Sequence, residues 1–253
     1  MTPQHDQRAE PRHSDASPAA SWRSPTASST SGIGETGEAA DASNDGDPTA
    51  GADPDNLRDT GDDHNGGEII IKAKRQLRSQ MRQARRRLDP ATVATASEAV
   101  ASRLITLPEI THAHVVMIYG AAPDEIDPQG CEQPLRDRGA RITYPRVEGN
   151  RLMVVEVAAN SAFSTGFAGI QEPLGPPTDP QTVDVVVVPG LGFDRTGRRL
   201  GQGKGYYDQL LPTMRAIRIA VAFDEQIVDE IPTDAHDQAM DVIVTPSQLI
   251  RCS

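Results

Sequence analysis

The chain has 253 residues, a net charge of −11 and only two cysteines, Cys131 and Cys252. No apolar stretch approaches the roughly 20 residues that a membrane-spanning helix needs, which argues against a membrane protein. The two cysteines have neither metal-binding nor redox spacing, so we expect ordinary free thiols and a reducing cytoplasm.

The negative charge is concentrated in residues 1–67, which hold four arginines, no lysine and thirteen acidic residues. This segment has too few apolar residues to offset its chain entropy, so we predict that it is a disordered acidic tail. It lacks the apolar core of a secretory signal and is too acidic for a transit peptide. Residues 68–253 are nearly neutral and long enough for one domain with a sizeable core.

The first expected helix, at 69–88, carries an unusual charge. Eight basic residues and no acid occur between positions 72 and 87: Lys72, Lys74, Arg75, Arg78, Arg82, Arg85, Arg86 and Arg87. Lys74 and Arg78 are four positions apart and share one face, where they repel unless an anion or another element neutralises them. The alternative is a solvated basic helix or a nucleic-acid patch.

Downstream, Asp89 as N-cap and Pro90 at the first helical position predict a second helix, at 90–106. Strands are then expected to alternate with helical segments. We expect strands at 114–119, 141–144, 151–157, 183–188, 218–223 and 242–244, and helical segments at 129–138 and 205–214. This order predicts an α/β domain with three αβα layers and a mainly parallel, Rossmann-like sheet. Ligands of such sheets bind at the carboxyl ends of the strands.

The stretch 189–208 follows the apolar run 185–188 and combines six glycines with three arginines, a lysine and a terminal Asp208. Glycines allow several backbone N–H groups to converge on an anion, and a carboxylate can hold Mg²⁺. The spacing matches neither a P-loop, which needs glycine where Arg198 stands, nor a dinucleotide fingerprint. We interpret it as a site for a metal-bound polyphosphate, the alternative being a flexible surface loop.

Two acidic segments flank other expected strands. Asp124, Glu125 and Asp127 follow the first strand and suit either a metal or a heterocycle with N–H donors, unless they form a solvated acidic loop. His236 and Asp237 precede the last strand and could act together as a ligand or as a general base. A lone histidine more often caps a helix or packs in a core.

Taken together, these segments resemble the 5-formyltetrahydrofolate cyclo-ligase family, also called methenyltetrahydrofolate synthetase. The resemblance runs from about residue 72 to 248 and rests on motifs in a fixed order. They are Lys74-Arg75-Gln76-Leu77-Arg78, Pro123-Asp124-Glu125-Ile126-Asp127, Tyr144-Pro145-Arg146-Val147, Gly169-Ile170-Gln171-Glu172-Pro173, the stretches 189–194 and 199–208, and His236-Asp237 followed by Asp241 and Val244-Thr245-Pro246.

The resemblance implies an ATP-driven cyclisation of 5-formyltetrahydrofolate to 5,10-methenyltetrahydrofolate, with release of ADP and phosphate. ATP phosphorylates the formyl oxygen, which is otherwise a poor leaving group, and the second folate nitrogen then closes the ring. We further expect a monomeric cytoplasmic protein that binds the small-molecule substrates reduced folate and ATP, and neither nucleic acid nor membrane.

It also implies a role for individual residues. Arg199 and Lys204 clamp the transferring phosphoryl group as catalytic residues, and Asp208 and Asp237 bind Mg²⁺. Glu125 and Tyr207 contact the folate, with Glu125 accepting from pterin N–H groups. ATP is bound by residues of two segments: Lys74, Arg75, Gln76, Leu77 and Arg78, and Arg199, Leu200, Gly201, Gln202, Gly203, Lys204, Gly205, Tyr206 and Tyr207.

Two positions depart from the family pattern. Gln202 stands where the family often has arginine or a larger side chain, and Pro128 follows Asp127 where the family often has threonine. Two other hypotheses remain: a non-catalytic protein of the same fold that holds reduced folate, and a nucleic-acid binder that uses residues 72–87.

Overall fold

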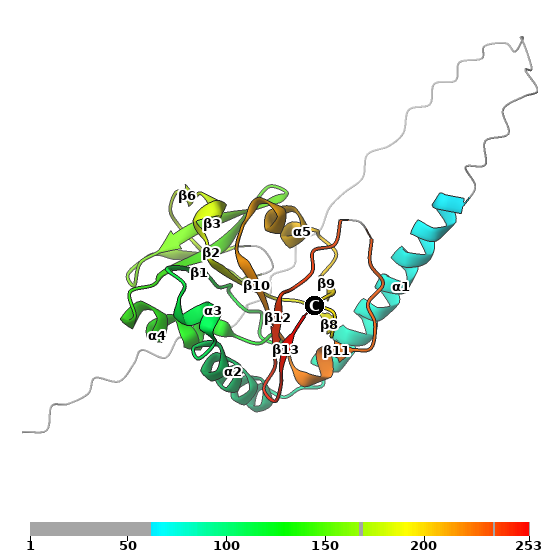
Figure 1. Ribbon diagram of the computed structural model, residues 1–253, viewed down its shortest axis with the longest axis horizontal. Coiled ribbons are helices and arrows are strands. Elements are labelled where there is room, and N and C mark those ends of the chain that lie inside the picture. Colours follow the sequence, from blue (N-terminus) through cyan, green and yellow to red (C-terminus); the bar gives the residue numbers. More distant parts are fainter. Residues whose placement is uncertain (1–61, 167–168, 235, 253) are drawn as a thin grey trace, which may run out of the picture. The chain divides into compact units, whose positions relative to one another are not determined.

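The computed structural model describes residues 62–166, 169–234 and 236–252, and only the backbone of residues 62–66. A sheet of eight strands forms the centre of the domain, in the order β13-β12-β10-β7-β1-β2-β3-β6 (Figure 1). The strands are β1 (Val115–Met117), β2 (Arg141–Glu148), β3 (Arg151–Val157), β6 (Pro177–Thr178), β7 (Val185–Val188), β10 (Ile217–Val221), β12 (Val242–Val244) and β13 (Leu249–Arg251).

The five inner strands, β12, β10, β7, β1 and β2, are mutually parallel, and antiparallel strands are added at both edges. In the centre of the sheet, Val186 of β7 is paired with Met117 of β1, and Val187 with Ile219 of β10. All four residues of β7 are buried, as an apolar run covered on both faces requires. The predicted mainly parallel sheet is therefore confirmed.

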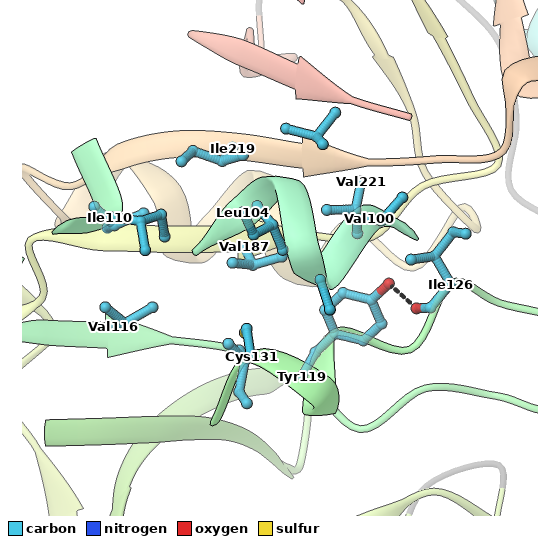
Figure 2. Close-up of a cluster of buried hydrophobic side chains, with 14 of the residues drawn as sticks. Val100, Leu104, Ile110, Val116, Tyr119, Ile126, Cys131, Val187, Ile219 and Val221 are labelled. Carbon is cyan, nitrogen blue, oxygen red and sulfur yellow. Dashed lines mark hydrogen bonds between the residues drawn. The ribbon is translucent and has the colours of Figure 1, made fainter. Parts of the chain in front are cut away.

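Helices cover both faces of this sheet, which gives the three predicted layers. One face packs against α2 (Pro90–Leu104), α3 (Pro108–Thr111) and α4 (Glu132–Asp137), and Figure 2 shows part of this cluster, including Leu104 of α2 with Val187 and Ile219. The other face packs against α5 (Tyr206–Leu210) and the 3₁₀ turn η4 (Leu211–Thr213). Alternate residues along β7 contribute to the two clusters, because successive side chains of a strand point to opposite faces.

Shorter elements connect these layers. A three-stranded sheet is formed by β11 (Ile227–Val228), β8 (Gly192–Asp194) and β9 (Arg199–Leu200), and a hairpin by β4 (Phe163–Thr165) and β5 (Gln171–Pro173). Further 3₁₀ turns in the described ranges include η1 (Pro128–Cys131), η3 (Pro180–Thr182) and η5 (Asp224–Gln226).

The first helix, α1 (Asp62–Arg85), packs against the three-stranded sheet and not against the central sheet. Leu77 and Met81, four positions apart, join a small cluster with the buried Leu191, Leu200 and Ile231 around the three-stranded sheet. The sequence predicted that this helix would begin at residue 69, but it begins earlier because adding turns to an existing helix costs little. Helix therefore extends into the predicted tail, and residues 1–61 of that tail lie outside the described residues.

Other boundaries also differ from the prediction, and three of the differences have a clear cause. The helix expected at 129–138 begins as η1 and continues as α4, and the helix expected at 205–214 ends at Leu210 and continues as η4, where Pro212 lacks a backbone N–H. The strand expected at 141–144 extends to Glu148, because β3 pairs with its whole length. The short strands of the three-stranded sheet were not predicted.

Two buried polar side chains hold the three-stranded sheet at the carboxyl end of β7. The Asp194 carboxylate accepts hydrogen bonds from the backbone N–H groups of Thr196, Arg198 and Ile231. The Gln226 amide donates to the carbonyls of Gly190 and Leu191 at 2.8 and 3.0 Å. Buried polar groups of this kind are stable only when they are paired, so they fix the path of the chain after β7.

We expect the core contact of α2 to dominate stability. Leu104 is fully buried, whereas Leu249 on the edge strand β13 is 45% exposed. Leu104→Ala should lower the free energy of unfolding by about 2–5 kcal/mol, through lost burial and a cavity. The matched change Leu249→Ala should alter it by less than about 0.5 kcal/mol. Urea denaturation followed by circular dichroism measures both, and equal effects would contradict this packing.

Candidate active site

The glycine-rich loop, residues 189–208, follows β7 and ends in the short helix α5. Gly203 and Gly205 have φ values of +100° and +71°, a backbone region that other residues rarely adopt. At Gly201 a Cβ atom would lie 3.0 Å from Nη1 of Arg199. The loop therefore needs glycine for two different reasons, backbone conformation and close approach of a side chain.

Arg199 is the buried cation of this loop. Its side chain is 5% exposed, and Nη2 donates to Oδ1 of Asp208 at 2.6 Å. Its guanidinium carbon lies 5.5 Å from the centre of the Tyr207 ring. Within the described part of the chain, the Nε of Arg199 is buried without a hydrogen-bond partner. Lys204 is exposed, and no hydrogen bond or ion pair joins it to another described residue.

One face of α1 carries four cations that contact the rest of the domain. Lys74, Arg78, Arg82 and Arg85 recur at spacings of four, four and three, which aligns them along the helix. Arg78 Nε donates to the carbonyl of Gly201 at 3.0 Å, and Arg82 Nη2 donates to the carbonyl of Gln202 at 3.2 Å. The middle of this basic face therefore lies against the glycine-rich loop.

The first cation of the face, Lys74, is 6% exposed and is paired with two carboxylates. Its Nζ lies 3.0 Å from Oδ2 of Asp234 and 2.5 Å from Oδ2 of Asp237. The backbone N–H of His236 and the Lys74 ammonium together lower the pKa of Asp234. The sequence showed no partner for the positive charge of Lys74, and the structure shows that Asp234 and Asp237 of the same chain neutralise it.

The last cation, Arg85, is 4% exposed and contacts the acidic loop, residues 123–127. Its guanidinium binds Asp124 through two nitrogens, at 2.6 and 3.3 Å, and Glu125 Oε1 through the third, at 3.0 Å. The other Glu125 oxygen accepts from the Ala122 backbone N–H at 3.2 Å. Gln202 of the glycine-rich loop also reaches Glu125 Oε1, at 3.4 Å.

The buried Tyr119 and the half-buried Tyr207 lie near this cluster. Tyr119 donates its hydroxyl to the Ile126 carbonyl at 2.5 Å (Figure 2). The hydroxyl of Tyr207 is buried and has no hydrogen-bond partner among the described residues. Burial is the main cause that raises the pKa of both tyrosines, and the Glu125 carboxylate adds to it. An unpaired buried hydroxyl is costly, which is typical of a group that serves a ligand.

Most of the residues predicted for the site come together here, through direct contacts among α1, the glycine-rich loop and the acidic loop. Within the predicted ATP segment, Lys74 and Arg78 face the domain and Leu77 packs in a core, whereas Arg75 and Gln76 are exposed. Leu200 is buried, and Tyr206 is half-buried.

The candidate metal ligands are each paired with a cation: Asp208 with Arg199, and Asp237 with Lys74. Asp127 caps η1 through the Gln129 N–H.

Sequence reasoning assigned no role to Arg82, Arg85 and Asp234. The spacing of Arg82 and Arg85 from Lys74 and Arg78 was a usable signal, because residues at these intervals share a helix face. Asp234 gave no such signal, since its contact with Lys74 joins positions 160 residues apart.

A cavity of about 690 Å³ lies at the other edge of the sheet, where β10 and β12 begin. It is lined by Arg215, Arg218 and Arg251 among others, and by none of the predicted site residues. Separately, no helix in the described ranges is long and apolar enough to cross a membrane.

The contacts just described fall within a segment that matches a known protein family. Residues 70–246 match the model of the 5-formyltetrahydrofolate cyclo-ligase family. The chain belongs to this family. The predicted resemblance is therefore confirmed, and the cyclo-ligases are enzymes.

Individual cyclo-ligases cover the same part of the chain. The 5-formyltetrahydrofolate cyclo-ligase of Mycolicibacterium smegmatis is 30% identical over 187 residues, which are 70% of this chain and 95% of the relative. The enzyme of Escherichia coli K12 is 28% identical, over 67% of this chain and 98% of the relative. The NMR structure of the Aquifex aeolicus 5,10-methenyltetrahydrofolate synthetase is 35% identical, with a TM-score of 0.64, and covers 70% of this chain and 92% of that protein.

Because these tyrosine hydroxyls are buried, we expect the stability of the protein to fall at alkaline pH. Tyr119, Tyr144 and Tyr207 have pKa values raised mainly by burial, whereas an unfolded tyrosine ionises near pH 10. Their contribution to stability is complete below pH 10 and is lost as the pH rises above it. Titration should show these three tyrosines ionising only together with loss of the circular dichroism signal. Ionisation of all three near pH 10 with the fold intact would contradict their burial.

Proposed function

We propose that this protein catalyses the ATP-dependent cyclisation of 5-formyltetrahydrofolate to 5,10-methenyltetrahydrofolate, with release of ADP and phosphate. Membership of the cyclo-ligase family supports the reaction. The observation that carries the proposal is the packing of the basic face of α1 on the glycine-rich loop, through Arg78 and the Gly201 carbonyl. This packing joins two groups of phosphate-binding residue types in one place.

The nucleotide half of the proposed site combines α1 with the glycine-rich loop. Lys74 is held by two carboxylates, and an ATP phosphate offers the same kind of oxygen acceptor in exchange. Arg78 lies within 3.6 Å of the position that a Cβ on Gly203 would occupy, so it borders the glycines directly. Arg199 and the exposed Lys204 supply positive charge from the same loop, as clamps for the transferring phosphoryl group.

The folate half of the proposed site centres on Glu125. A carboxylate has about four lone-pair positions. Arg85 and the Ala122 N–H fill two of them, and the contact to Gln202 is long at 3.4 Å. When the Gln202 side chain moves off Glu125, two acceptor positions of the Glu125 carboxylate are free. They match a pair of pterin N–H donors. The unpaired Tyr207 hydroxyl supplies a hydrogen bond to the same substrate.

The chemistry needs positioning and charge neutralisation. The formyl oxygen of the substrate attacks the γ-phosphorus of ATP, and the bond to the leaving ADP breaks. N10 of the folate then attacks the formyl carbon, its proton is lost, and the carbon–oxygen bond breaks to release phosphate. Arg199 and Lys204 stabilise the negative charge of the phosphoryl group in the first step and of the departing phosphate in the second.

The donor chemistry also suits Mg²⁺. This ion is bound by one or two carboxylates together with phosphate oxygens and water, and Asp208 and Asp237 are such carboxylates. In the described ranges no three His, Cys, Asp or Glu side chains form a metal cluster. Under the proposal, nucleotide phosphates and water supply the remaining oxygens. When bound, the ion neutralises charge on the phosphates. The monomeric state and the cytoplasmic location remain predictions.

A direct assay tests the proposed reaction. Purified protein mixed with 5-formyltetrahydrofolate, ATP and Mg²⁺ should produce the methenyl product, followed by its near-ultraviolet absorbance. The signal should require ATP, and one ADP should form for each product. Tight folate binding without any ATP-dependent product would instead identify a non-catalytic folate-binding protein.

The nucleotide assignment predicts a selective effect of Lys74. Lys74→Ala removes a charged hydrogen-bond donor and should lower kcat/KM for ATP by about tenfold or more, since such bonds contribute roughly 1.5–3 kcal/mol. The matched control is Lys72→Ala, which removes an exposed lysine two positions away and should change kcat/KM by less than about twofold. Steady-state kinetics at saturating folate measures both, and equal losses in the two variants would contradict the assignment.

A further inference from the structure

Arg85 is a buried cation at the end of α1 that the proposed reaction does not use. It is 4% exposed, and its three nitrogens contact carboxylates only. A buried charge is tolerated when its partners are close and well oriented, and here both partners belong to the acidic loop. Arg85 therefore fixes that loop relative to α1.

The geometry of the guanidinium gives the two carboxylates different roles. Asp124 takes two nitrogens of Arg85, at 2.6 and 3.3 Å, and this fork sets the plane of the guanidinium. The third nitrogen then points at Oε1 of Glu125, at 3.0 Å. The side chain of Asp124 is 39% exposed and that of Glu125 is 12% exposed. Asp124 therefore orients Arg85, and Arg85 orients the more buried Glu125.

Glu125 has few other restraints of comparable strength. The Ala122 N–H reaches its second oxygen at 3.2 Å, and Gln202 reaches the first at 3.4 Å from an exposed side chain. Arg85 is the one charged donor among these three. Without it, the carboxylate would be free to rotate and to reorient towards solvent.

We propose that Arg85 is a positioning residue for folate: it holds the Glu125 carboxylate in the orientation that receives the pterin N–H groups. This inference rests on the proposed function, because it concerns the substrate of the same site. Arg85 itself touches no substrate. Asp124 supports it by fixing the guanidinium plane.

A purely structural role makes a different prediction. Arg85 also ties α1 to the domain, and α1 carries Lys74 and Arg78. If Arg85 only anchored the helix, its loss would weaken ATP and folate binding together. If it positions Glu125, folate binding alone is weakened, because Leu77 and Met81 still pack and Lys74 and Arg78 still hold their own partners.

The test compares Arg85→Ala with Arg86→Ala, the neighbouring arginine, which is exposed on the helix. Isothermal titration calorimetry gives the Kd of 5-formyltetrahydrofolate without ATP, and kinetics gives the two KM values. Arg85→Ala should raise the folate Kd and KM by about tenfold and change the ATP KM by less than about twofold. Arg86→Ala should change none of them by more than about twofold.

Two further variants keep the test decisive if Arg85→Ala folds poorly. Arg85→Lys retains the charge but not the fork, and should raise the folate Kd by less than Arg85→Ala. Adding Glu125→Gln to Arg85→Lys should weaken folate binding by less than the two separate changes predict, because both act on one interaction. Equal rises in the folate and ATP KM, or additive effects of the two changes, would overturn the proposal.

The outcome for wild-type protein separates this inference from the proposed function. If wild-type protein binds folate but forms no product, the proposed reaction fails, and the folate Kd values still decide the role of Arg85. If it forms product while Arg85→Ala leaves the folate Kd unchanged, only the role of Arg85 is overturned. Wild-type protein that neither binds nor converts folate overturns both.

Discussion

The pairing of the basic face of α1 with oxygen atoms of three separate loops is the constraint on which the site depends. Four cations on one helix face repel one another, and two of them, Lys74 and Arg85, are almost completely buried. Exposed ion pairs contribute little to stability, but a buried cation that loses its partner is strongly destabilising. Helix α1 can therefore pack stably only when the acidic loop and the glycine-rich loop are correctly folded and Asp234 and Asp237 are in place.

This constraint links the fold to the chemistry. The central sheet sets where β7 ends, and Asp194 and Gln226 then direct the chain into the glycine-rich loop. The three-stranded sheet supplies the apolar contact for Leu77 and Met81, which aims the basic face of α1 at that loop. Under the proposed function, Lys74 and Arg78 of this helix serve the nucleotide. With the inferred role of Arg85, which acts through Glu125, the same helix also carries a cation for the folate.

The sequence was sufficient to predict the six strands from β12 to β3 and much of the candidate site, but not the edge strands β6 and β13. The apolar run 185–188 identified the central strand, and the alternation of strands and helices predicted the layers. The glycines and basic residues of 199–208 predicted the loop that α1 contacts. The short strands β8, β9 and β11 were not predicted, because they lack the three-residue apolar run that identified β1 and β12.

The hydrogen-bond partners of the α1 cations could also not be predicted from the sequence. The sequence indicated that Lys74 and Arg78 needed neutralising oxygens, but these lie more than 120 residues away along the chain. Gln202, which departs from the family pattern, contacts Glu125 and Arg82 through long hydrogen bonds of 3.4 Å. Such a contact depends on the packing of two loops, which local pattern does not encode.

A structure of the protein with a non-hydrolysable ATP analogue and 5-formyltetrahydrofolate would show whether α1 and the two loops form the substrate site together. We expect phosphate oxygens within hydrogen-bond distance of Lys74 and the glycine-rich loop, and the pterin within hydrogen-bond distance of Glu125. A nucleotide bound instead in the cavity lined by Arg215, Arg218 and Arg251, with Lys74 still paired to Asp234 and Asp237, would contradict it.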